Sequence, residues 1–178
     1  MIPSPQECLD IMKEYNMLGH IVRHSLLVKR VAVCLAEELN RAGEDLDISK
    51  VTAGAFLHDI MKTRSIITGE DHAKAGGELL ERLGFNGISE IVRQHVTMDN
   101  EINSPTVSEI EVVNYADKRV KHDKVVALEE RFADIRKRYG YNEERVCLIN
   151  LSEHNVMDLE RKLFSRLSIN SDALFTIP

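Results

Sequence analysis

Apolar residues recur every three to four positions along most of the chain, which is the spacing of an amphipathic helix. We find no convincing strand pattern, internal repeat or low-complexity segment in the sequence. The pattern predicts an all-α protein, a compact multi-helix bundle whose buried centre could hold a metal. Helices are expected over about residues 5–16, 19–41, 71–82, 87–96, 123–138 and 142–167. Two further helices are expected, one that is capped by Asp47 or Ser49 and includes His58, and one that begins at about residue 106. Loops are expected at 63–70 and 100–105, and an irregular tail at 168–178.

Four polar residues lie on helix faces that should be buried. His24 lies one turn before Val28 on the apolar stripe of its helix, and His95 ends another such stripe. His58 and Asp117 share faces with apolar residues of their own helices. Polar groups in such places need partners that compensate for lost contact with water.

Asp59 follows His58 directly, and the pair closes the apolar run 53–57. An imidazole and a carboxylate are both common metal ligands. Because adjacent helical residues are about 100° apart, the pair could approach one cation from two sides, or Asp59 could bridge two cations. The candidate ligands are His24, His58, Asp59 and Asp117 for a first metal, with His72 and His95 for a second metal that shares Asp59.

Histidine and carboxylate ligands together suit Fe, Mn, Zn, Ni or Co better than Ca or Mg. Taken alone, each of these histidines would more often be an ordinary core or surface residue. His20 precedes His24 by four residues, but no glutamate follows it as in the zinc protease motif, so that protease interpretation fails. His20 is interpreted as a pocket-rim or helix-start residue, and His122 and His154 as surface groups.

The composition of the chain indicates which kinds of partner and which cellular compartment are expected. The length of 178 residues fits one domain. The net charge of −6 makes a nucleic-acid partner less expected, because such a partner favours a basic surface. Its three cysteines are scattered without a CxxC motif, so reduced thiols in a cytoplasmic protein are the simplest interpretation. No signal peptide is indicated, and no run approaches the roughly 18 apolar residues of a membrane span.

The order of the candidate ligands resembles the HD-domain superfamily of metal-dependent phosphohydrolases. Their contexts match as well, in Leu57-His58-Asp59-Ile60-Met61-Lys62 and Tyr115-Ala116-Asp117-Lys118-Arg119-Val120. Within a single domain of residues 1–178, the resemblance covers about residues 19–120, and it leaves a helical extension at 121–167 and the tail unassigned.

With His72 and His95 added, the ligand pattern resembles that of the two-metal branches of the superfamily. These include the HD-GYP and HDIG-type phosphodiesterases and the small bacterial dinucleoside-tetraphosphate hydrolases. Met61 stands where the HDIG branch has glycine, and the chain has no GYP motif. A cyclic-dinucleotide phosphodiesterase is therefore not indicated in particular.

The resemblance implies one or two divalent transition metals and a metal-bound hydroxide that attacks a phosphate ester or anhydride, such as a nucleotide or dinucleoside polyphosphate. Asp59 would bridge the metals and orient the hydroxide. Lys62 lies three residues after Asp59, close to one helical turn, so it could neutralise phosphate charge in the same cavity. Arg119, Arg23 and His20 are weaker candidates for substrate binding, and a surface salt bridge is the alternative for both arginines.

Two other functions remain open. Di-iron oxygenases on the HD fold resemble this sequence in the same six ligands, so the ligand set alone does not separate hydrolysis from oxygen chemistry. Some HD-like domains are non-catalytic nucleotide sensors, although all six ligands are present here. A homodimer is compatible with the sequence, and the basic positions Arg131, Arg136, Lys137 and Arg138 are interpreted as a solvated helix face.

Overall fold

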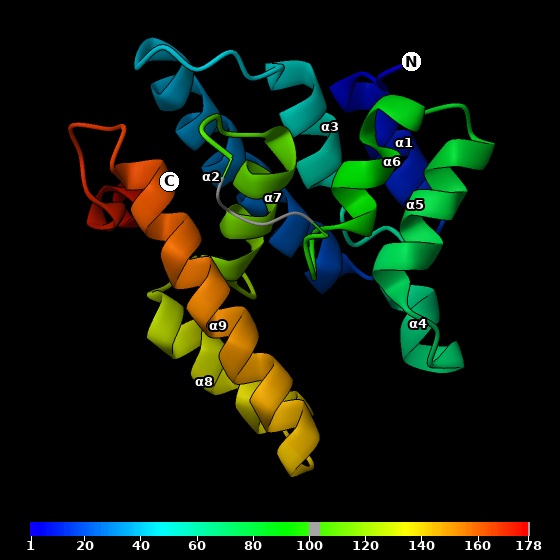
Figure 1. The fold of residues 1–178 in the computed structure, drawn as a ribbon. Coiled ribbons are helices and arrows are strands. Elements are labelled where there is room, and N and C mark those ends of the chain that lie inside the picture. Colours follow the sequence, from blue (N-terminus) through cyan, green and yellow to red (C-terminus); the bar gives the residue numbers. More distant parts are fainter. Residues whose placement is uncertain (100–103, 178) are drawn as a thin grey trace.

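The computed structural model describes residues 1–99 and 104–177 and is almost wholly helical (Figure 1). This confirms the predicted all-α fold class. The expected loop at 100–105 falls mostly outside the described residues. The elements are α1 (Pro5–Glu14), α2 (Gly19–Arg41), α3 (Ile48–Leu57), α4 (Lys62–Thr68), α5 (His72–Arg82), α6 (Asn86–Arg93), α7 (Glu109–Lys118), β1 (Val120–Lys121), β2 (Lys124–Val125), α8 (Leu128–Tyr139), α9 (Glu143–Phe164) and the 3-10 helix η1 (Ser171–Thr176).

Several helices begin where a short polar side chain can bond to the free backbone amides of the first turn. Ser4 and Ser108 each form a capping box, with a glutamate three residues later returning a hydrogen bond. Asp47 caps α3, and Asp71 caps α5 by accepting from the amides of the second and third helical residues. Helix α5 then ends before Gly84, which has a φ of +82°.

The predicted loop at 63–70 is wrong, because most of it is helix α4. This helix buries no residue, and Ile66 and Ile67 are 62% and 84% exposed, so no core-facing stripe marks it in the sequence. It ends at Gly69, whose φ is +73°.

The expected absence of strands and the fully irregular tail are also corrected. Strands β1 and β2 form a short antiparallel hairpin in which Val120 pairs with Val125, and α8 begins only after it. Strands of two residues are too short to show alternation in the sequence. Within the tail, Asn170 caps η1, which buries Leu174.

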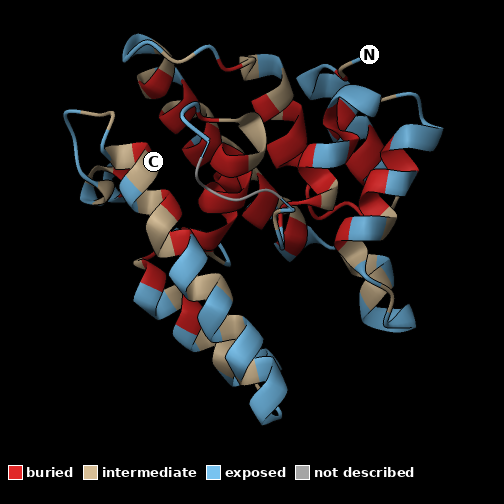
Figure 2. Cartoon of the chain, in the orientation of Figure 1, coloured by how far each residue is buried: buried red, intermediate tan, exposed pale blue. Residues whose placement is uncertain are grey.

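Helices α2, α3 and α7 pack against one another at the centre; α6 packs against α3, and α5 packs against α6. The apolar stripe of α2 is buried there as predicted, with Val28, Val31 and Leu35 at most 1% exposed. Helices α8 and α9 form a hairpin that projects from this body, and its outer surface is largely exposed (Figures 1 and 2). Within the described residues, no helix is both long enough and apolar enough to cross a membrane.

Gly54 allows α3 and α6 to approach closely. A Cβ atom at this position would lie 2.6 Å from Cγ2 of Ile91 and 3.2 Å from its Cβ. Ile91 branches at Cβ and has little freedom to turn away. We expect Gly54→Ala to lower the free energy of unfolding by about 1–2 kcal/mol in urea denaturation, because overpacking outweighs the roughly 1 kcal/mol that alanine gains in helix propensity.

A double-mutant cycle with Ile91→Ala separates the steric cause from a general helix effect. The second substitution should cost less in the Gly54→Ala background than in the wild type, since it removes the clash. Gly19→Ala is the matched control, because its added Cβ would meet only Arg23 Nη1 at 3.8 Å. Additive effects of Gly54→Ala and Ile91→Ala would contradict the steric explanation.

Candidate metal centre

The six predicted ligands come together although they belong to five different parts of the chain. Each lies where its segment meets the centre of the bundle, and all except His72 are at most 9% exposed. His24 lies in α2, His58 and Asp59 directly after α3, His72 at the first position of α5, His95 just after α6, and Asp117 in α7.

The first group is formed by His24, His58 and Asp59, whose ligand atoms all lie within 4.8 Å of one another. Asp117 adjoins it, with Oδ1 3.0 Å from Nε2 of His24 and 3.7 Å from Nε2 of His58. Two imidazoles and two carboxylates therefore converge on one small volume.

The second group is formed by Asp59, His72 and His95. Oδ1 of Asp59 lies 3.1 Å from Nε2 of His72 and 3.6 Å from Nε2 of His95, whereas its Oδ2 lies 3.6 Å from Nε2 of His58. The two oxygens of one carboxylate thus face the two groups, which is the placement that a bridging ligand requires.

Main-chain carbonyls orient three of the imidazoles. Nδ1 of His58 lies 2.8 Å from the carbonyl oxygen of Ala55, and Nδ1 of His95 lies 2.6 Å from that of Val92. Nδ1 of His24 lies 3.1 Å from the carbonyl oxygen of residue 122. Because a carbonyl can only accept, Nδ1 carries the proton in each ring, and the lone pair of Nε2 points into the centre.

This arrangement leaves acceptors facing acceptors. Nε2 of His24 lies 3.0 Å from a carboxylate oxygen of Asp117, and Nε2 of His95 lies 3.6 Å from Oδ1 of Asp59. Nε2 of His58 is buried and has no hydrogen-bond partner among the described residues. A buried acceptor without a partner is costly, and a cation between these atoms would satisfy all of them. The donor set therefore fits one or two divalent transition metals.

Burial and close charges shift the pKa values of the cluster in opposite senses. Burial lowers the pKa of His58 to about 4, although the neighbouring carboxylates oppose this shift. Burial alone would raise the pKa of Asp59, but the imidazoles of His58, His72 and His95 outweigh it and hold that pKa well below its usual range. The centre therefore combines neutral imidazole with ionised carboxylate at neutral pH, which is the state that binds metal.

The metal-free protein should lose stability as the pH falls from about 6.5 to 4. His58 titrates at 6.5 in the unfolded chain and near 4 in the folded protein, so the unfolded state binds more protons between these values. The stabilisation is complete above pH 6.5 and declines below it, by about 1–3 kcal/mol. Burial also lowers the pKa of His72, which adds in the same direction.

Thermal denaturation in a chelator across this pH range checks the expectation. His58→Gln should flatten the decline, and His154→Gln, which removes an exposed imidazole, should leave the profile unchanged. An equally steep decline in His58→Gln would contradict the assignment to His58.

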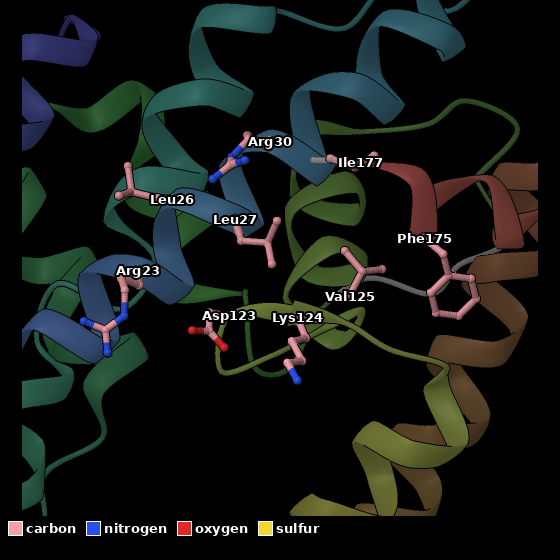
Figure 3. Close-up of a pocket in the computed structure, with 9 residues that line it drawn as sticks. All are labelled: Arg23, Leu26, Leu27, Arg30, Asp123, Lys124, Val125, Phe175 and Ile177. Atoms are coloured by element: carbon pink, nitrogen blue, oxygen red, sulfur yellow. The ribbon is translucent and has the colours of Figure 1, made fainter.

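The structure separates the predicted substrate-binding residues. Lys62 reaches the centre, with Nζ 3.2 Å from Nε2 of His72. His20 is exposed in the first turn of α2, and it belongs to neither of the two ligand groups that the described residues form. Arg23 is also exposed and lines a separate cavity beside α2 (Figure 3).

The prediction that Arg119 binds substrate is corrected by its burial. Arg119 is 1% exposed, and its guanidinium donates to the carbonyl oxygens of Val126 and Ser171, to the hydroxyl of Tyr115 and to Glu160. These bonds hold the extension to α7. The surface salt bridge considered as the alternative is also wrong, because the guanidinium is buried, while the side chain of its partner Glu160 is 29% exposed.

Two cations beside Asp117 were not identified as part of the site. Nζ of Lys118 lies 2.7 Å from Oδ2 of Asp117 and 3.0 Å from the carbonyl oxygen of His95, so it supports two ligands at once. Nη2 of Arg131 lies 3.8 Å from Oδ1 of Asp117. Arg131 therefore does not belong to a fully solvated helix face, as the sequence had indicated.

These two cations differ in what the sequence reveals of them. Lys118 directly follows Asp117, and this adjacency was the signal available in the sequence. Arg131 comes from α8, and nothing in its local sequence points to the centre. Burial would raise the pKa of Asp117, but Lys118, His24 and Arg131 hold it well below its usual range.

Residues 21–122 match the sequence profile of the HD domain, and the chain therefore belongs to the HD domain family. It is 37% identical over 97 residues to a tRNA (cytidine(56)-2'-O)-methyltransferase of Thermoplasma volcanium, a match that covers 54% of this chain and 27% of the relative. The chain thus spans about a quarter of that protein.

Two further matches extend over most of the chain. It is 28% identical over 169 residues to an uncharacterized protein of Methanocaldococcus jannaschii, which covers 85% of this chain and 98% of the relative. A crystal structure of a predicted HD superfamily hydrolase from an uncultured Thermotogales bacterium aligns with a TM-score of 0.52 at 24% identity, over 92% of this chain and 93% of that one. The latter likeness supports the fold.

Proposed function

We propose that this protein is a metal-dependent phosphohydrolase that acts on a small phosphate ester or anhydride, most simply a nucleotide or dinucleoside polyphosphate. The observation that carries the proposal is the pair of ligand groups joined through Asp59, with Lys62 at their edge. Divalent transition metals in such a centre polarise a phosphoryl oxygen and lower the pKa of bound water, so no serine or cysteine nucleophile is needed.

The side chains of the centre divide the remaining work. Asp59 orients both groups through its two oxygens, and Lys118 holds Asp117 through Oδ2 so that Oδ1 stays directed at the imidazoles. Nζ of Lys62, 3.2 Å from Nε2 of His72, places a cation where a phosphate on the second group would lie. Lys62 therefore binds the substrate phosphate.

Arg131 offers a second cation to the substrate, from the extension beyond the matched HD region. Its side chain is 16% exposed, Nε has no hydrogen-bond partner among the described residues, and Nη2 lies 3.8 Å from Asp117. We expect Arg131→Gln to raise KM for a phosphate ester about tenfold, because a charge-assisted hydrogen bond contributes about 1.5–3 kcal/mol.

The comparison of variants distinguishes this role from a structural one. Arg131→Lys should recover part of the loss, and Lys137→Gln, which removes an exposed charge from the same helix, should leave KM unchanged. An unaltered KM together with a lower melting temperature in Arg131→Gln would assign Arg131 a structural role only.

Phosphate release from a substrate panel tests the proposed function. Protein purified without oxygen is loaded with Mn²⁺, Fe²⁺, Co²⁺, Ni²⁺ or Zn²⁺ and assayed with nitrophenyl phosphate, nucleotides, dinucleoside polyphosphates and a short RNA. The RNA is included because one relative is named for an activity on tRNA. The net charge of −6 disfavours a long polyanion, so we expect small substrates to be preferred.

The rival functions give different results in the same samples. Oxygen uptake that requires iron, without phosphate release from any compound, would support the oxygenase. Nucleotide binding without turnover under every metal would support the sensor. Either outcome would contradict the proposed hydrolase.

A further inference from the structure

Helix α6 ends without a glycine to complete its backbone hydrogen bonds. The last carbonyls of a helix have no partner within it, and a glycine just after the helix commonly helps to satisfy them. Here Gln94, His95 and Val96 follow the last helical residue, Arg93. His95, a ligand of the second group, therefore lies where α6 has already ended, and its backbone has to be fixed by other parts of the chain.

Two side chains of α7 bind this segment. Nδ2 of Asn114 lies 3.2 Å from the carbonyl oxygen of Gln94 and 2.9 Å from that of His95. Nζ of Lys118, one helical turn further along α7, lies 3.0 Å from the carbonyl oxygen of His95. Because a carbonyl can only accept, the amide nitrogen of Asn114 has to face these oxygens. Donors from α7 thus hold the end of α6.

Packing alone does not account for an amide at position 114. Asn114 is 2% exposed, and its Oδ1 is buried without a hydrogen-bond partner among the described residues. A buried acceptor without a partner destabilises a fold, and an apolar side chain at this position would avoid that loss. What the amide contributes is the pair of hydrogen bonds that its Nδ2 donates.

Asn114 connects the two ligand groups through the scaffold. Asp117, which adjoins the first group, lies three residues later on the same helix, whereas His95 belongs to the second group. Nδ1 of His95 lies 2.6 Å from the carbonyl oxygen of Val92, so the direction of the ring follows the backbone at the end of α6. A shift of this segment along α7 would move Nε2 of His95 away from Oδ1 of Asp59, which now lies 3.6 Å from it.

We propose that Asn114 is a positioning residue for the second ligand group and determines whether the centre holds two metals or one. The first group depends less on this contact, because His24 and His58 are oriented by carbonyl oxygens of other segments. The inference rests on the two-metal centre of the proposed function, but it does not depend on the reaction that this centre catalyses.

Competition with a chromogenic chelator can measure the affinity of each group for Co²⁺ separately. Only the second group keeps all its ligands in His24→Ala, and only the first group does in His95→Ala. Added to His24→Ala, Asn114→Leu should weaken Co²⁺ binding about 10–100-fold, which is the usual effect of losing a residue that supports a metal ligand. Added to His95→Ala, it should change the affinity by less than about threefold, since the remaining group does not use this contact.

The otherwise unaltered protein gives the matching stoichiometry. At limiting free Co²⁺, elemental analysis should find two metals per chain in the wild type and one in Asn114→Leu. Leucine keeps the bulk of the side chain and removes the unpartnered acceptor, so this variant should fold, and Asn114→Ala provides a second, smaller replacement. Ser89→Ala is the matched control, because it removes a hydrogen bond of a buried residue of α6, to the carbonyl oxygen of Asn86, and should keep both metals.

The outcomes separate this inference from the proposed function. It is overturned if the wild type binds fewer than two metals, if both variants of Asn114 keep two metals with wild-type affinity, or if the first group loses as much affinity as the second. Two metals in the wild type, one in Asn114→Leu and no phosphate release from either protein would refute the hydrolase and support the role of Asn114.

Discussion

Replacing Asp59 with Asn is expected to leave the protein folded, to weaken metal binding at least a hundredfold and to remove hydrolysis. Oδ1 of Asp59 lies 3.1 Å from Nε2 of His72, and Oδ2 lies 3.6 Å from Nε2 of His58. An uncharged amide offers an acceptor to one of these sides only. Loss of a residue that merely supports a metal ligand costs about 10–100-fold, so loss of a shared ligand should cost at least the upper value.

Competition with a chromogenic chelator measures the affinity, and elemental analysis gives the number of metals per chain. Circular dichroism checks that the helices persist. Asp45→Asn removes an exposed carboxylate elsewhere and should behave as wild type. Two metals bound to Asp59→Asn with wild-type affinity would show that this carboxylate does not join the two groups.

Arg119→Met is expected to lower the free energy of unfolding by about 3–5 kcal/mol, because it breaks a network of hydrogen bonds centred on a buried guanidinium. The substitution keeps most of the length of the side chain, but it takes the donor from two carbonyl oxygens and leaves Glu160 with only the hydroxyl of Tyr115 as donor. A domain is stable by only about 5–15 kcal/mol, so this is a large fraction of the total. The melting temperature should fall by about 6–20 °C for a chain of this size.

Arg161→Met provides the matched comparison. Arg161 pairs with Asp158 on the exposed face of α9, and such surface pairs contribute about 0–1 kcal/mol. If Arg119→Met melted within 2 °C of the wild type, the network around Glu160 would not hold the extension to α7. Glu160→Gln should retain more stability than Arg119→Met, because its amide can still accept one hydrogen bond.

The features that the sequence predicted well are those with a local signature. The stripe through Val28, Val31 and Leu35 marked α2, and Asp71 marked the start of α5. Local patterns failed where a helix buries no face, as in α4, and where strands have two residues, as in the β1–β2 hairpin. Periodicity reports burial against the rest of the fold, so an element that buries little is not visible to it.

Arg119 and Arg131 show a second limit of prediction from local sequence. Arg119 follows the Asp117 motif and was interpreted as a surface or substrate-binding residue, yet it is buried against Glu160. Arg131 was interpreted as solvated, yet it approaches Asp117. Both outcomes depend on how α8 and α9 fold back onto α7, which is tertiary information. A helix position specifies the face on which a charge lies, but not the charge that another helix brings to meet it.

The hydrogen bonds from Nδ1 of His24, His58 and His95 to main-chain oxygens have a consequence for how such a centre can change over time. Every residue carries a carbonyl, so the side chains at positions 55, 92 and 122 can be exchanged while the supporting oxygen stays. What has to persist is the course of the backbone where α3 and α6 end and where the hairpin turns. The path of the backbone therefore determines which oxygens orient these imidazoles, and related proteins can keep the same hydrogen bonds without sharing any residue at those three positions.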